Sequence, residues 1–403
     1  MKKIFFLFFL LIFLTSTTFA GTVNLPRTGQ TKCYDTAGTE ISCSGTGQDG
    51  DIQAGVAWPE PRFTDNGDET MTDNLTGLMW TTFASFLISG YYPYDTLTWQ
   101  QSLDYVEGMN AGTYPNYGYT DWRLPNVNEL ESLVNANEPN SATWLNGQRF
   151  IDVQVGYYFS STSYAIYTGS AWLISMWYGY VVDSEKSGKC LFWPVRSGQC
   201  GSLDHSAICL PKTGQIVGYA SGDDGDLEQG VAWPSPRFTD HGNRTVTDNL
   251  TGLMWTKYAR SDKKWQEALD YCNSLTQAGY TDWRLPNINE LHSLTDYSRC
   301  NPALPSGHPF TNVQGHIYWS STTSASVPDS AWIVDMWDGS VNHYNKSDDY
   351  RYVWPVRGGQ IQSSECSTWT DVVEKYQAYK NDQATLRDLI ECYREWRAIS
   401  IDR

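Results

Sequence analysis

The chain has 403 residues, of which 40% are hydrophobic and 14% aromatic, and its formal net charge is −17. This length is enough for two or three domains with cores of their own. Beyond the first 20 residues no region has an excess of basic residues, so a nucleic-acid partner, which needs a positively charged footprint, is excluded.

The N-terminus has the pattern of a signal peptide. Two lysines, Lys2 and Lys3, precede an apolar run from Ile4 to Leu14, and small residues follow as far as Ala20. The apolar run is too short to span a bilayer stably. We therefore expect cleavage of residues 1–20, no transmembrane segment in the mature protein, and a periplasmic, cell-surface or extracellular location.

Export makes disulfides possible, and the chain has nine cysteines. Their positions suggest four pairs, although the connectivity cannot be deduced from the sequence alone. The pairs are Cys33 with Cys43, Cys200 with Cys209, Cys272 with Cys300, and Cys366 with Cys392. Cys190 is left without a partner.

A long internal repeat defines the organisation of the chain. Residues 51–80 match 226–255, and Thr120–Asn126 returns as Thr281–Asn287. A period of this size is that of a whole domain, which indicates a tandem duplication rather than a solenoid. We predict two units with separate cores, at residues 21–199 and 210–362, with 200–209 as linker and 363–403 as a tail.

Each unit is expected to contain short antiparallel strands and two helices, an α+β arrangement. The strand and helix signals follow hydrophobic periodicity and turn residues. In unit one they predict a hairpin over 62–72, helices over 99–109 and 126–135, and strands over 157–160, 171–177, 181–183 and 191–196. In unit two they predict helices over 264–277 and 287–297. In the tail, apolar spacing on both sides of Asn381 predicts an α-helical hairpin.

The repeated block around Thr-Asp-Trp-Arg-Leu-Pro-Asn is interpreted as a structural corner. A proline followed by a glutamate indicates the start of a helix, where the glutamate can cap. The arginine is expected to pair with a nearby carboxylate rather than to bind a substrate. The residues assigned to this core motif are Trp122, Arg123, Pro125 and Glu129 in unit one, and Trp283, Arg284, Pro286 and Glu290 in unit two.

The chemistry common to both units is limited. Unit one has no histidine, since His205 lies in the linker and the other five lie in unit two, and no cysteine position is shared. Nucleophile–histidine catalysis and histidine-ligated zinc therefore cannot be common to both units. Acidic turns such as Asp49–Asp51 and Asp224–Asp226 are candidates for calcium. Because Asp, Asn and Gly also form ordinary turns, we predict no metal and no cofactor, with calcium as the open alternative.

The candidate binding face follows from strand alternation. Trp172 and Trp332 share a parity with Ile174 and Val334 and are assigned to the core. Trp177 and Trp337 have the opposite parity and stand next to turn glycines. We assign Trp177, Tyr178, Trp337 and Asp338 to ligand binding; the alternative is that both tryptophans cover a second layer of core.

Several motifs together resemble the Lcl C-terminal domain family. They are Asp73–Trp80, Gly118–Leu130, Tyr318–Thr322, Ala331–Trp332 and Val356–Gly359, with their counterparts in the other unit. The resemblance implies a C-type-lectin-like fold. In the collagen-like adhesin that names the family it also implies adhesion, trimer assembly and binding of sulfated glycans. Unit one has 19 acidic and 8 basic residues, which argues against a sulfated ligand here.

These observations favour an exported, non-enzymatic binding or adhesion protein. The expected partner is a glycan or a cell-surface protein, and a homo-oligomer is possible. The alternatives are a hydrolase that uses paired carboxylates and a structural envelope protein that assembles through its tail.

Overall fold

The computed structural model describes residues 23–85, 96–197, 208–347 and 350–358, together with Val373 and Tyr376. The predicted signal peptide, the predicted helical hairpin of the tail apart from those two positions, and the Cys366–Cys392 pair lie outside the described residues. Within them, no helix combines the length and the apolar character needed to cross a membrane.

The described chain forms two lobes and two N-terminal segments. We use first lobe for residues 57–197, second lobe for 232–358, first segment for 23–56 and second segment for 208–231. The first segment contains β1 (Cys33–Tyr34), β2 (Glu40–Ile41) and α1 (Asp49–Ile52), and the second contains α5 (Asp224–Leu227).

The lobes share most of their elements in the same order. Among the described residues, the first has an additional helix at Ser141–Gly147, and the second has additional strands at Arg260–Lys263 and Arg351–Val353. The first has β3 (Phe63–Asp65), β4 (Thr70–Asp73), β5 (Leu78–Thr81), α2 (Trp99–Asn110), α3 (Val127–Glu131), α4 (Ser141–Gly147), β6 (Tyr157–Ser163), β7 (Ser170–Ser175), β8 (Val181–Glu185) and β9 (Val195–Ser197). The second has β10 (Phe238–Asp240), β11 (Thr245–Asp248), β12 (Met254–Thr256), β13 (Arg260–Lys263), α6 (Trp265–Asn273), α7 (Ile288–His292), β14 (Ile317–Thr323), β15 (Ser330–Asp335), β16 (Ser340–Asn345), β17 (Arg351–Val353) and β18 (Val356–Arg357).

One sheet runs through both lobes. Its order is β13-β17-β14-β15-β16-β8-β7-β6, and the lobes join where β16 pairs antiparallel with β8. The joining pair is Val181 with Val341, which are equivalent positions of the repeat, so an approximate two-fold axis passes between them. Each lobe also has its own four-stranded sheet, β3-β4-β5-β9 or β10-β11-β12-β18.

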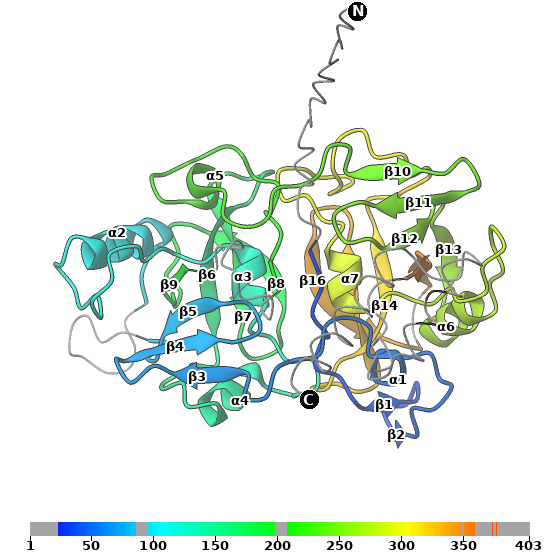
Figure 1. The fold of residues 1–403 in the computed structure, drawn as a ribbon, viewed down its shortest axis with the longest axis horizontal. Helices are drawn as coiled ribbons and strands as arrows, with labels where there is room; N and C mark the ends of the chain where they lie inside the picture. The colour runs from blue at the N-terminus through cyan, green and yellow to red at the C-terminus, as the bar shows by residue number, and fades with distance from the viewer. Residues whose placement is uncertain are drawn as a thin grey trace, which may run out of the picture.

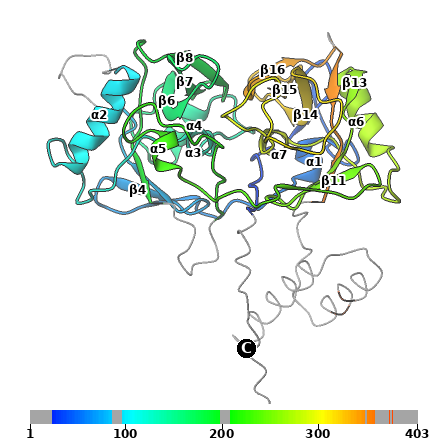
Figure 2. The same cartoon turned by 90° about the horizontal axis from the view of Figure 1, so that it is seen from above.

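The layers are visible from above. In Figure 2 the strands of the shared sheet lie on one side and β4 and β11 on the other, with α3 and α7 between them. The helices α2 and α6 flank the two outer sides. The core between the layers holds large rings such as Trp80 against Trp193, and Trp255 against Trp354.

The prediction of two separate cores is wrong. A single apolar cluster spans both lobes, and Trp172 of the first lobe packs edge-on against Tyr297 of the second, with ring centroids 5.1 Å apart. The reason is that β8 and β16 would otherwise be open sheet edges, with unpaired N–H and C=O groups. Pairing them covers both edges and buries the tryptophans beside them.

Each N-terminal segment is seated mainly on the lobe of the other repeat. Figure 1 shows α1, β1 and β2 beside β14 and α6 of the second lobe, and α5 beside β6 of the first. Hydrogen bonds confirm this exchange: Asn287 donates to the Ala54 carbonyl at 3.1 Å, and Asn126 donates to the Gln229 carbonyl at 3.2 Å.

The predicted elements are found with different bounds. The helix expected over 126–135 ends after Glu131, and the one over 264–277 ends after Asn273. The strand expected over 191–196 begins only at Val195, because Pro194 has no N–H to donate to a ladder. Asp49–Asp51, expected to form an ordinary turn, begins a single turn of α-helix, α1.

Of the predicted disulfides, Cys33–Cys43 is confirmed. Cys209 is disulfide-bonded, and its predicted partner Cys200 lies outside the described residues. The Cys272–Cys300 pair is wrong: both thiols are free, because Cys272 is buried against the sheet while Cys300 is exposed. Cys190, which was left over from the four predicted pairs, is free.

Candidate functional site

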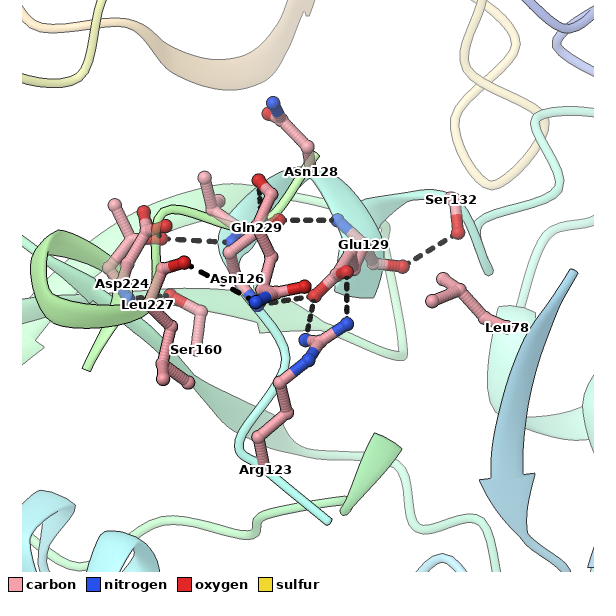
Figure 3. A network of polar contacts seen from close by, with 12 residues as sticks. Leu78, Arg123, Asn126, Asn128, Glu129, Ser132, Ser160, Asp224, Leu227 and Gln229 are labelled. Carbon is pink, nitrogen blue, oxygen red and sulfur yellow. Dashed lines mark hydrogen bonds and ion pairs between the residues drawn. The ribbon is translucent and has the colours of Figure 1, made fainter. Parts of the chain in front are cut away.

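The repeated block is a buried ion-pair corner (Figure 3). Arg123 donates from Nη1 to Glu129 Oε2 at 2.5 Å and from Nη2 to Oε1 at 2.6 Å. Asn126 and Glu129 form a capping box, in which each side chain accepts from the backbone N–H of the other residue. Two parallel charge-assisted bonds hold both groups in one geometry. This arginine therefore has a structural function, as predicted.

The second copy has the same geometry. Arg284 reaches the two oxygens of Glu290 at 2.5 and 2.6 Å, and Asn287 caps the helix. The remaining members of the predicted core motif, namely Trp122, Pro125, Trp283 and Pro286, are all buried. A substrate could not reach either corner without opening the lobe.

The same block holds the exchanged segment. Besides Asn126, Asn128 donates to the Pro211 carbonyl of the second segment at 3.0 Å, and Asn289 donates to the Pro26 carbonyl of the first at 3.1 Å. Sequence reasoning missed this function. The Asn-x-Asn spacing in both copies was the available signal for this contact. Every residue has a main-chain carbonyl, so the sequence does not show which carbonyls the asparagines bind.

A fully buried aspartate fastens each segment to the lobe that receives it. Asp224 Oδ2 accepts from Thr213 of its own segment at 2.6 Å and from Thr162 of the first lobe at 2.8 Å. Asp49 Oδ2 accepts from Thr28 at 2.6 Å and from Thr322 of the second lobe at 2.7 Å. Burial raises the pKa of Asp49 to about 6 and that of Asp224 to about 7, because the charged form loses its hydration.

The two lobes meet across the approximate axis at a cavity of about 90 Å³. His292 Nδ1 lies 2.8 Å from Glu131 Oε2, and these two residues occupy equivalent positions in the repeat. His292 Nε2 lies 3.1 Å from the Gly339 carbonyl oxygen and 2.6 Å from the Tyr297 hydroxyl. The Glu131–His292 pair thus joins the two lobes at the axis, where equivalent positions of the repeat face each other.

An aromatic ladder lies on the first lobe beside the seam between the lobes. The Trp177 ring stacks on Tyr178, with centroids 4.7 Å apart and planes within 7°, and Tyr178 stacks on Tyr180 at 5.1 Å. Tyr180 hydrogen-bonds to His343 of the second lobe. Trp177 is 48% exposed, so its outer face is free at the end of the ladder.

The equivalent turn of the second lobe has a different chemistry. Trp337 is 46% exposed, but its neighbour is Asp338, which accepts from the Tyr164 hydroxyl of the first lobe at 3.0 Å. Trp172 and Trp332 are buried, at 1% and 4% exposure, so strand alternation separated core from surface tryptophans correctly. The four predicted ligand-binding residues fall into two separate places, one in each lobe.

The shared carboxylates of the two repeats are engaged in the fold. Glu129 and Glu290 pair with arginines, and each buried aspartate holds two threonine hydroxyls. Within the described part of the chain, no group of three or more His, Cys, Asp or Glu side chains could hold a metal ion.

The architecture is that of a duplicated α+β fold with strand-rich lobes. The family model of the Lcl C-terminal domain matches residues 69–196 and 244–357, which together make up more than half of the chain. The protein therefore belongs to the Lcl C-terminal domain family and contains the domain twice. No curated protein matches the chain.

Proposed function

We propose that this protein is an exported, non-enzymatic binding protein whose C-type-lectin-like lobes recognise a glycan or another cell-surface partner. The observation that carries the proposal is the exposed Trp177 face at the end of the Trp177–Tyr178–Tyr180 ladder. The ladder holds this ring in a single orientation, and a flat, fixed aromatic face suits the apolar face of a sugar ring.

The charge of the lobes limits which glycans are suitable ligands. The first unit has an excess of acidic residues, which repels sulfated or otherwise anionic glycans. A neutral glycan is therefore the favoured ligand. The different neighbours of Trp177 and Trp337, a tyrosine and an aspartate, support two sites of unequal specificity rather than two copies of one site.

A hydrolase that uses paired carboxylates is less well supported. In the described residues, the glutamates common to both repeats are locked in ion pairs with arginine, and Asp49 and Asp224 are fully buried. Neither kind of carboxylate has the access to substrate that glycoside hydrolysis requires.

The test is a glycan array with the mature protein, with and without calcium, followed by affinity measurements on variants. Trp177→Ala is expected to weaken binding of a neutral glycan by roughly tenfold or more, as for an aromatic anchor, and to change the free energy of unfolding by less than about 1 kcal/mol. Tyr167→Ala is the matched control, because Tyr167 is 67% exposed on the same lobe but lies outside the ladder.

An unchanged affinity in Trp177→Ala would rule out the ladder as the binding site. A loss of several kcal/mol in stability would instead assign this ring to the core. Binding that disappears when calcium is chelated would mean that a metal is required, contrary to our prediction.

A further inference from the structure

Both lobes hold a lysine at the same place, immediately after β8 or β16. Lys186 Nζ lies 3.9 Å from the ring centroid of Trp99, the first residue of α2, and Lys346 Nζ lies 4.2 Å from that of Trp265, the first residue of α6. The exchanged segment seated on each lobe adds a tyrosine beside the ammonium: Tyr219 at 4.9 Å for Lys186 and Tyr34 at 5.9 Å for Lys346.

In the second lobe this site is closed by the chain itself. Lys346 is fully buried, and its ammonium donates to the main-chain carbonyls of Pro328 at 2.9 Å, Asp35 at 3.2 Å and Tyr34 at 3.4 Å. Two of these carbonyls belong to the β1–β2 hairpin of the first segment, which the Cys33–Cys43 disulfide closes.

In the first lobe the same site is open. Here the second segment is ten residues shorter between Gly214 and Asp224 than the first is between Gly29 and Asp49, so it has no hairpin. The Lys186 ammonium makes one hydrogen bond within the described residues, to Ser163 Oγ at 2.6 Å. A hollow of about 520 Å³ lies next to it, lined by Trp99, Thr168, Lys186 and Tyr219 among others.

We propose that the hollow over Lys186 is a docking site for a polypeptide turn of a partner protein. The turn would present two consecutive main-chain carbonyl oxygens to the ammonium, as Tyr34 and Asp35 do at Lys346. This proposal does not depend on glycan binding at the aromatic ladder, because it concerns a different site on the first lobe.

The chemistry of the site favours a neutral peptide turn over an anion. The equivalent ammonium is satisfied by carbonyl dipoles alone, and the acidic excess of the first unit works against a negatively charged ligand. The exposed ring that lines the hollow, Tyr219 at 41% exposure, can pack on a turn. Burial lowers the pKa of the Lys186 ammonium, and two further acceptors would offset that loss of hydration.

The chain supplies the probe for the experiment. A synthetic peptide of residues 31–45, oxidised to form the Cys33–Cys43 bridge, contains the hairpin that closes the second site. Titrated into the full-length protein by calorimetry, it is expected to bind with a stoichiometry of one. Lys186→Met, which keeps the apolar stem, and Tyr219→Ala are each expected to weaken binding by roughly tenfold or more.

Two controls locate the peptide. Lys346→Met is expected to leave the affinity for the peptide unchanged, because the site at Lys346 is already filled by the chain. Trp177→Ala is also expected to leave it unchanged. Acylation of lysines by an amine-reactive reagent is expected to label Lys186 in the free protein, to be blocked there by the peptide, and to miss Lys346 throughout. The absence of binding, or binding that both Lys186→Met and Tyr219→Ala leave unchanged, would overturn the proposal.

Discussion

The two lobes agree where side chains are buried and differ where they face each other or the solvent. The Arg–Glu corner, the capping asparagine and the aspartate that fastens a segment are the same in both. Beside the axis, however, Glu131 corresponds to His292 and Tyr178 to Asp338. In a symmetric pair of identical lobes each residue on the axis meets its own copy, whereas a duplicated chain can place a glutamate opposite a histidine.

The contrast extends to the lysine sites. The second lobe is completed by a hairpin that the second segment lacks, so the lysine is buried in the second lobe and partly exposed in the first, whereas its Trp neighbour is buried in both. Duplication therefore preserved the scaffold and left one site filled and its twin open. The following predictions test whether the corners and buried aspartates of the two lobes are equivalent, and whether the hairpin and the axis residues differ in their effects.

The largest effect is expected at the corner that both lobes share. Arg123→Ala and Arg284→Ala should each lower the free energy of unfolding by about 3–5 kcal/mol, because each leaves a buried glutamate without its partner. Urea unfolding measures this loss. Lys257→Ala, which removes a partly exposed pair with Asp240, is the control and should cost less than about 1 kcal/mol. Unequal losses in the two arginine variants would mean that the corners are not equivalent.

The buried aspartates should make stability depend on pH. Their folded pKa values, about 6 for Asp49 and about 7 for Asp224, lie above the ordinary value of 3.8, so the folded state binds protons more tightly than the unfolded state. The stabilisation is complete below pH 3.8 and is lost as the pH rises through the folded pKa, by about 3 kcal/mol for Asp49 and about 4 kcal/mol for Asp224.

Asp49→Asn and Asp224→Asn remove this titration while keeping an acceptor for the two threonine hydroxyls. Urea unfolding between pH 4 and pH 8 should therefore show a smaller fall in stability with rising pH for each variant than for the wild type. Asp51→Asn, in the same turn but partly exposed, is the control. Identical pH profiles for the wild type and both variants would exclude these carboxyls as the cause.

The disulfide that closes the hairpin should have a smaller effect, confined to the second lobe. Cys33→Ser with Cys43→Ser should cost about 2–3 kcal/mol, the loop-closure value for this separation. The same double variant should let an amine-reactive reagent label Lys346, as it labels Lys186 in the wild type. If Lys346 stays unlabelled, the hairpin holds its place without the disulfide.

The smallest effect is expected on the axis. His292→Glu places two carboxylates where Glu131 now meets an imidazole, and should cost roughly 2 kcal/mol. Adding Glu131→His should recover part of that loss, because the two positions are related by the axis. Recovery should be incomplete, since only His292 has Tyr297 as a neighbour. Additive losses in the double variant would show that the two side chains are not energetically coupled.

Much of each lobe could be predicted from local sequence. Strand parity separated the buried Trp172 and Trp332 from the exposed Trp177 and Trp337. The proline and glutamate of the repeated block indicated the capped helix, and the arginine of the same block was expected to pair with a nearby carboxylate, which is Glu129 in the first lobe. These features depend on periodicity and on contacts between residues near in sequence, so the local pattern determines them.

The sequence by itself thus determined the duplication, the family, and the local structure of each repeated block. Only the tertiary structure decided which lobe each segment completes, how β8 meets β16, and which lysine is covered. The physical reason is that Leu25–Gln30 and Leu210–Gln215 are nearly the same, and the asparagines that hold them bind main-chain carbonyls. Either lobe offers the same asparagine and threonine donors to either segment, so local energies do not distinguish the two arrangements. The packing of the shared sheet and the connections between its strands determine which lobe each segment packs on.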